Sequence, residues 1–226
     1  MTLFYSNNIN TTHLYLENQE MIHCKKSLRK KNGDLVNVLD GKGSLYNCKI
    51  INIEKCKLEI IDKKKFKNKN KVHLLIAPTK NHKRIEWMLE KIVEIGLYRI
   101  SFIICNNSIR KEVNLKRLNK IALSAMKQTK NYFLPIIDNC INYQESFQLI
   151  KSKEKYIAHL CYNGLPNLNS IKDSKGTKCI LIGPEGDFTE NEIKYALDMK
   201  FIEISLGNSR LRTETAGIVS TTILNL

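Results

Sequence analysis

The chain of 226 residues is long enough to form one large domain or two small ones with a hydrophobic core. Its 42% hydrophobic and 26% charged residues are ordinary for a soluble globular protein. No apolar run approaches the ~20 residues of a membrane span, and Met1–Asn10 lacks the pattern of a signal peptide. A net charge of +15 indicates a polyanionic partner, with RNA as the first candidate.

The cysteines and histidines exclude two further classes of protein. The seven cysteines form no CxxC pair and their number is odd, which argues against a disulfide framework and against a zinc site. The five histidines show no i, i+4 spacing. We therefore expect reduced thiols, a cytoplasmic location and no metal.

Residues 1–70 have the pattern of a small β-barrel with one helix. The predicted elements are a strand at Leu3–Tyr5, a helix at Gln19–Lys31 ending at Asn32-Gly33, a strand at Leu35–Leu39, a hairpin turn at Asp40-Gly41 and alternating β-prone residues over Ser44–Glu59. The lysine-rich run Asp62–Lys71 is predicted to be the least structured stretch and the boundary between domains 1–70 and 71–226.

From Val72 the pattern changes to alternating strands and helices, which predicts an α/β domain with a parallel sheet. The apolar residues of Asn81–Glu94 recur every three or four positions, and Gly96 ends that helix. The other predicted elements of this region are strands at Val72–Ile76, Ile100–Cys105 and Tyr156–Leu160 and a helix at Leu115–Lys127.

Two strand–glycine–helix units follow near the C-terminus. The apolar run Cys179–Ile182 stops at Gly183-Pro184-Glu185-Gly186, and a capping box of Thr189 and Glu192 begins a helix. The second unit is a strand at Phe201–Leu206, then Gly207 and a helix from Thr213. We expect the two glycine loops to lie side by side at the carboxyl edge of the sheet, where such folds bind ligands.

These C-terminal segments, GPEGDFTENEI and LGNSRLRTETAGI, resemble the paired signature of the SPOUT methyltransferases. They are most similar to the small-subunit ribosomal RNA methyltransferase E (RsmE) family, which methylates N3 of a uridine in bacterial 16S rRNA. HCKKSLRKKNGDLVNVLDGKG resembles that family's PUA-like domain. The resemblance implies a PUA-like β-barrel followed by a SPOUT-type Rossmann-like parallel sheet with a C-terminal trefoil knot, a homodimer packed through Thr213–Leu226, and 16S rRNA of the small subunit as substrate.

The chain lacks the GxxxxGK[ST] and GxGxxG patterns of phosphate-binding loops. Glu185 instead makes the first glycine loop negative, which suits the sulfonium of S-adenosyl-L-methionine. Glycines allow the main chain to approach the cofactor, and apolar side chains would enclose the adenine. The predicted cofactor-binding residues are Leu181, Ile182, Gly183, Glu185, Gly186, Ser205, Leu206, Gly207, Leu211 and Arg212.

Arg212 and Glu214 are the candidate catalytic residues. Arg212 would steer an RNA phosphate or stabilise the uracil oxygen as N3 loses its proton. Glu214 either takes that proton or satisfies N–H groups at the start of its helix. His159 is predicted to pack at a strand end, in preference to lining the cofactor pocket.

His23, Arg29 and Arg210 are the predicted RNA-binding residues, although His23 and Arg29 equally suit a role in tying the helix to the barrel. The lysine-rich first domain is expected to grip the RNA. Asn131 stands where members of the family carry an arginine. Because of Asn131, an inactive RNA chaperone that binds the cofactor stays open as an alternative. The nearest enzymatic alternative is another SPOUT specificity, ribose 2′-O-methylation.

Overall fold

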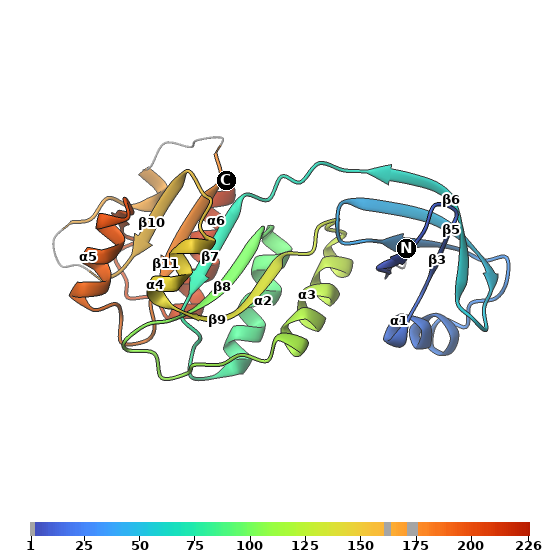
Figure 1. Cartoon of the computed structure of the whole chain (residues 1–226), viewed down its shortest axis with the longest axis horizontal. Coiled ribbons are helices and arrows are strands. Elements are labelled where there is room, and N and C mark those ends of the chain that lie inside the picture. The colour runs from blue at the N-terminus through green and yellow to red at the C-terminus, as the bar shows by residue number, and fades with distance from the viewer. Residues whose placement is uncertain (1–2, 161–163, 171–175) are drawn as a thin grey trace. The chain divides into compact units, whose positions relative to one another are not determined.

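The computed structural model describes residues 3–160, 164–170 and 176–226. The chain divides into two units, the first comprising Met1–Lys69 and Leu123–Leu134 and the second Asn70–Ala122 and Pro135–Leu226 (Figure 1).

The first unit is built on a six-stranded sheet of order β1-β4-β5-β6-β3-β2, in which only the pair β1 and β4 is parallel. Alternate residues of β5 point inward, so that Tyr46, Cys48 and Ile50 join Phe4 and Leu58 in the buried core. The strands are β1 (Leu3–Tyr5), β2 (Asn8–Ile9), β3 (His13–Tyr15), β4 (Leu35–Leu39), β5 (Ser44–Asn52) and β6 (Lys57–Lys65).

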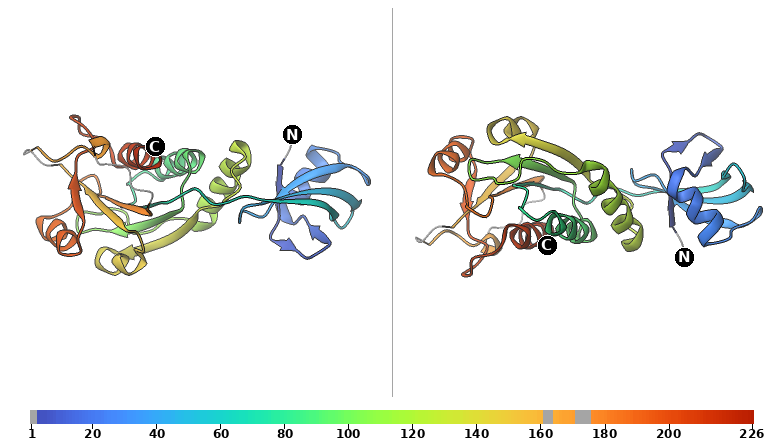
Figure 2. Two further views of the ribbon diagram at one scale, coloured as in Figure 1. Left: turned by 90° about the horizontal axis from the view of Figure 1, so that it is seen from above. Right: turned by 90° about the horizontal axis from the view of Figure 1, so that it is seen from below.

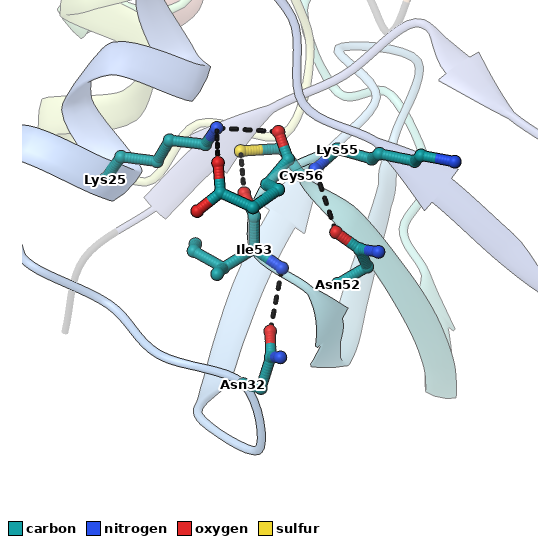
Figure 3. A network of polar contacts seen from close by, with 7 residues as sticks. Lys25, Asn32, Asn52, Ile53, Lys55 and Cys56 are labelled. Atoms are coloured by element: carbon teal, nitrogen blue, oxygen red, sulfur yellow. Dashed lines mark hydrogen bonds and ion pairs between the residues drawn. The ribbon is translucent and has the colours of Figure 1, made fainter.

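The helix of this unit is shorter than predicted. Helix α1 (Asn18–Ile22) continues into a single π-helical stretch, η1 (His23–Ser27), and ends before the predicted Lys31. Arg29 has a left-handed backbone with φ of 48°, which a helix cannot continue through. Because the helix has already ended, Asn32 does not terminate it. Instead, Asn32 Oδ1 accepts the Ile53 N–H at 2.7 Å (Figure 3).

The turn between β5 and β6 is held by polar contacts of this kind. Lys25 Nζ donates to the Glu54 carbonyl at 2.6 Å, and the Lys55 N–H donates to Asn52 Oδ1 at 2.9 Å (Figure 3). Because Lys25 lies in η1 and Asn32 precedes β4, these bonds fasten both segments to one hairpin end.

The prediction of an unstructured run from Asp62 is wrong for its first part. Residues 62–65 continue β6 and pair with β5, with Lys65 opposite Ser44. Their side chains are exposed, and Lys63 Nζ lies 5.0 Å from the centre of the Tyr46 ring. Solvated lysines are thus compatible with a strand here, because the backbone pairing and not the side chains holds it.

A second chain segment, Leu123–Leu134, also belongs to the first unit, so a single division at residue 70 omits part of it. It contains the end of α3 (Leu115–Thr129), where Lys127 forms an ion pair with Glu20. The rings of Tyr132 and Phe66 stack with centroids 3.7 Å apart. Asn131, in the turn after α3, accepts the Phe133 N–H at 3.1 Å.

The second unit is a parallel six-stranded sheet of order β12-β10-β11-β7-β8-β9. Helices α2 and α6 cover one face and α4 and α5 the other (Figure 2). The strands are β7 (Val72–Ile76), β8 (Arg99–Ile104), β9 (Ile136–Asn142), β10 (Glu154–Ala158), β11 (Lys178–Ile182) and β12 (Ile202–Ile204). The helices are α2 (His82–Ile95), α4 (Tyr143–Ser146), α5 (Glu190–Asp198) and α6 (Thr213–Asn225), with short 3-10 turns η2 (Phe147–Leu149) and η3 (Leu168–Ser170).

Local sequence signals set most of these boundaries. Every residue of β7 and β11 is buried, as their apolar runs predict for central strands. Asn81 caps α2 by accepting the Lys83 N–H, and Gly96 ends that helix with φ of 114°. The predicted capping box of Thr189 and Glu192 at the start of α5 is confirmed.

The two glycine loops lie at the same edge of the sheet and line one pocket there, although the strands that precede them are not neighbours. Strand β10 lies between β11 and β12, so the end of β10 separates the two loops. Strand β9 and helix α4 were not predicted. Among the described residues, every helix is too short or too polar to cross a membrane.

A buried polar network joins the amino ends of β7, β8 and β9. His73 Nε2 lies 2.7 Å from Ser101 Oγ, and Ser101 Oγ donates to Asp138. Arg99 also binds Asp138, from Nη2 at 2.9 Å. Because the Ser101 proton is directed to the carboxylate, His73 Nε2 must carry a proton and donate to Ser101. A neutral imidazole satisfies this network.

We predict that His73 makes stability depend on pH. Burial, and secondly the charge of Arg99, lower the pKa of His73 to about 4 from its ordinary 6.5. Between pH 6.5 and 4 the unfolded chain binds a proton that the folded chain does not. The free energy of unfolding therefore decreases as the pH is lowered from 6.5 to 4, by about 3 kcal/mol in total. His73→Gln, which keeps a donor but does not titrate, should flatten this dependence in denaturant unfolding. Equal slopes for the two proteins would contradict the prediction.

Candidate active site

A pocket of about 380 Å³ lies at the carboxyl ends of β10, β11 and β12. Its volume falls within the range of roughly 300–1,000 Å³ typical of small-molecule sites. The walls come from the segments after these three strands, the first turn of α6 and one residue of α2: Arg84, Ala158, His159, Leu160, Ile182, Gly183, Pro184, Glu185, Asp187, Ser205, Leu206, Gly207, Ser209, Arg210, Leu211, Arg212, Thr213, Glu214 and Ala216.

The loop after β11 is fixed on its pocket side by three hydrogen bonds. Thr213 Oγ1 donates to the Gly183 carbonyl at 3.1 Å, and both groups are buried. The Leu160 N–H donates to Asp187 Oδ2 at 2.9 Å. Arg210 Nη2 donates to the Glu185 carbonyl at 3.2 Å. The loop is thereby joined to the end of β10, to the segment after β12 and to the start of α6.

The outer side of the same loop contacts the loops after β7 and β8. Glu185 Oε1 accepts the Lys80 N–H at 2.9 Å, so its carboxylate is engaged by main chain. Asn107 Nδ2 donates to the carbonyls of Gly186 and Asp187 at 3.0 and 3.1 Å. A Cβ on Gly186 would lie 3.1 Å from the Asn107 Cβ.

Gly186 and Leu181 do not line the pocket, unlike the other predicted cofactor-binding residues. Gly186 allows the close approach of Asn107, on the other side of the loop. Leu181 is fully buried in the hydrophobic core with Phe188 and Ala196. Since successive strand residues point to opposite faces, Leu181 and Ile182 cannot both face one ligand.

The segment after β12 provides the opposite wall. The Ser205 N–H donates to the Pro166 carbonyl at 2.9 Å, and Ser205 Oγ accepts the Gly207 N–H at 3.2 Å. Gly207 has φ of 131°, a conformation that favours glycine. Leu206 and Leu211 are half-buried and add apolar surface to the pocket.

His159 both packs and lines the pocket. Its side chain is 6% exposed, and Nε2 lies 2.9 Å from Glu203 Oε1 of β12. The sequence analysis predicted that His159 packs at a strand end and placed a role in the pocket second. Nothing in the sequence indicated that β10 lies between the strands β11 and β12 that precede the two glycine loops.

The charged residues that line the pocket are three arginines, the carboxylates of Glu185 and Asp187 in the loop after β11, and the buried carboxylate of Glu214. Glu214 is 5% exposed, and its Oε1 lies 3.5 Å from Nη1 of Arg84, which is 40% exposed. Arg210 and Arg212 are exposed. Glu214 also lies in the first turn of α6, where the helix dipole favours a negative charge.

Sequence reasoning missed Arg84, Asp187 and Thr213 as pocket residues. Asp187 and Thr213 lie within the two motifs that carried the resemblance, so that signal was present. Arg84 lies more than a hundred positions earlier, on α2, and no local pattern marks it.

The predicted RNA-binding residues do not all belong to one unit. His23, whose ring centroid is 5.8 Å from that of Phe4, and the exposed Arg29 belong to the first unit, whereas Arg210 lines the pocket in the second. Within the described part of the chain, no three His, Cys, Asp or Glu side chains are grouped to hold a metal ion.

The parallel sheet with a ligand pocket at its carboxyl edge and the small β-domain correspond to the two domains of an RNA methyltransferase, which two family models match. The RNA methyltransferase domain family matches residues 66–225, and the RNA methyltransferase PUA domain family matches residues 16–63. Ribosomal RNA small subunit methyltransferase E of Mesomycoplasma hyopneumoniae is 32% identical over 225 residues, which cover 96% of each chain. The chain belongs to the ribosomal RNA small subunit methyltransferase E family, as its sequence predicted.

Solved structures agree with this assignment. A probable rRNA-methyltransferase from Porphyromonas gingivalis superposes with a TM-score of 0.89 at 34% identity, covering 98% of this chain and 95% of that one. The small subunit methyltransferase E of Neisseria gonorrhoeae, bound to S-adenosyl methionine, gives a TM-score of 0.84 at 26% identity with the same coverage. The predicted α/β fold with a PUA-like N-terminal domain is confirmed.

Proposed function

We propose that this protein transfers the methyl group of S-adenosyl-L-methionine to N3 of a uridine in 16S rRNA of the small ribosomal subunit. The observation that carries the proposal is the pocket at the ends of β10, β11 and β12, with the buried carboxylate of Glu214 in its wall, in a chain of this family. The cofactor is supported by the relative from Neisseria gonorrhoeae, and the N3 specificity by the sequence resemblance.

The pocket residues fit this cofactor. Ile182, Leu206 and Leu211 provide apolar surface of the kind that encloses a nucleobase. Asp187, on the pocket side of the loop, brings negative charge to the wall that would face the positively charged sulfur of the cofactor, whereas the carboxylate of Glu185 is held by the Lys80 N–H. When bound, the cofactor supplies a methyl group on a positively charged sulfur, so that formation of the N3–carbon bond breaks the carbon–sulfur bond and releases a neutral thioether.

The proton of uracil N3 has to be accepted by a base, and we assign this role to Glu214. It is the most buried carboxylate in the pocket wall, and Arg84 orients it from the facing helix α2. Arg212, exposed at the N-cap of α6, stabilises the negative charge that develops on the uracil oxygen. The remaining contribution is placement of N3 in line with the methyl group.

The same resemblance predicts a trefoil knot in the second unit, a homodimer through α6 and a cytoplasmic location. These stay predictions.

Replacing Glu214 distinguishes the role of a base from that of a helix-start charge. Glu214→Gln keeps the shape of the side chain, and we expect kcat to fall at least about 100-fold, the usual contribution of general base catalysis. Calorimetric affinity for the cofactor should stay near that of the wild type. Glu190→Gln removes an exposed carboxylate from the first turn of α5 and is the matched control. A kcat for Glu214→Gln as high as that of the control would leave Glu214 only its role at the helix start.

Mass spectrometry of rRNA tests the function itself. A strain lacking the protein should lose N3-methyluridine from 16S rRNA, and the wild-type chain should restore it whereas Glu214→Gln should not. Loss of a ribose 2′-O-methyl group instead would assign the other specificity. An unchanged set of modified nucleosides would contradict the proposed activity and favour an RNA-binding role without catalysis.

A further inference from the structure

A second concave surface, outside the cofactor pocket, lies between the start of α2 and the loop of residues 105–114 that joins β8 to α3. Two adjoining hollows of about 650 and 440 Å³ form it. We call it the basic groove and define it by five cations and one apolar residue: Lys80, Lys83, Ile109, Arg110, Lys111 and Arg117.

The positive charge of the basic groove is largely uncompensated. The carboxylates in its walls are Glu86 and Glu112, and Glu86 is held by Arg117, whose Nη2 lies 2.7 Å from Glu86 Oε2. Among the ion pairs of the described residues, none includes Lys80, Lys83, Arg110 or Lys111. Their charges are therefore available to an anionic partner.

Arg110 is fixed without a counter-charge. Its Nη2 donates to the Lys80 carbonyl at 2.8 Å, and its Nε is 3.2 Å from the Thr79 carbonyl. Main-chain carbonyls orient a guanidinium but leave its net charge in place. The loop after β7 and the loop after β8 are thus held together around a cation.

Hydrogen bonds connect the loops of the basic groove to the loop of the cofactor pocket. The Lys80 N–H binds Glu185 of the pocket loop, and Asn107 binds the carbonyl of Gly186. Lys83 of the groove precedes Arg84 of the pocket on α2. A polymer that places one nucleotide at the pocket could therefore continue along the groove.

Ile109 adds an apolar contact to this charged surface. Its side chain is 66% exposed and stands beside Arg110 and Lys111. Single-stranded RNA offers both complements, since its phosphates match the cations and its unstacked bases present flat apolar faces.

We propose that the basic groove binds the RNA strand flanking the target uridine, with Lys80, Lys83 and Lys111 on phosphates and Ile109 against a base. This inference rests on the proposed function and extends it. It also assigns part of the RNA grip to the catalytic unit, in addition to the first domain that the sequence favoured.

The test compares two triple variants of the full-length protein. Lys80→Ala/Lys83→Ala/Lys111→Ala removes three exposed lysines of the groove. Lys151→Ala/Lys153→Ala/Lys194→Ala removes three exposed lysines elsewhere in the same unit, two of them just before the amino end of β10. Affinity for small ribosomal subunits from a strain lacking the protein is measured against salt concentration, and cofactor affinity is measured separately by calorimetry.

Each phosphate contact contributes about 0.7 to the log–log salt slope for a single strand, so the groove variant should lower that slope by about 2 relative to the control. At 0.1 M salt this corresponds to a loss of affinity on the order of 100-fold. Ile109→Ser should weaken binding with the salt slope unchanged, because an apolar contact releases no counterion. Cofactor affinity should be the same in all variants.

Failure of this inference differs from failure of the proposed function. If the wild type methylates the subunits and the groove variant binds them as the control does, the groove inference is wrong and the function stands. If the wild type methylates nothing, the proposed function fails. A photo-crosslinking amino acid at position 109 should attach to rRNA; attachment to ribosomal proteins alone, or to nothing, would overturn RNA as the occupant.

Discussion

The hydrogen bond from Thr213 Oγ1 to the Gly183 carbonyl is the contact on which the pocket depends most. Strands β11 and β12 are two positions apart in the sheet, about 10 Å at the usual strand spacing. The loops after them would not meet without a connection across the end of β10. Thr213 provides it, because it is the first residue of α6 and binds the end of the β11 strand. Glu214, next in the chain, is thereby placed at the pocket.

Hydrogen bonds from the neighbouring loops also hold the loop after β11, and they differ between its two sides. Asp187 and Gly183 hold the pocket side, whereas Glu185 and Gly186 face the loops after β7 and β8. The cofactor pocket and the basic groove are therefore linked through this loop, because Glu185 of the pocket accepts the N–H of Lys80 in the groove. We therefore expect the two sites to be held in position relative to each other before RNA binds, which lowers the entropy cost of an RNA strand that occupies both.

The sequence predicted those features that local chemistry determines and missed those that depend on strand order. The capping box at Thr189 and the end of α2 at Gly96 follow from short-range patterns, and both are present. The insertion of β10 between β11 and β12 follows from packing of residues far apart in the chain, so the pocket role of His159 was placed second. Arg84 reaches the pocket from α2, and its role was not foreseen. Nor does a sequence reveal which side of a loop needs a glycine, as Gly186 illustrates.

The most direct test of this account is the cofactor affinity of Thr213→Val beside that of Thr222→Val. Both changes remove a hydroxyl from α6 and keep its shape, but Thr222 donates to the Ile218 carbonyl within the helix. Leaving the buried Gly183 carbonyl without its donor costs about 1–3 kcal/mol, so Thr213→Val should weaken S-adenosyl-L-methionine binding about tenfold or more by calorimetry. Thr222→Val should bind as the wild type does. Equal affinities for the two variants would contradict the claim that this bond holds the cofactor pocket together.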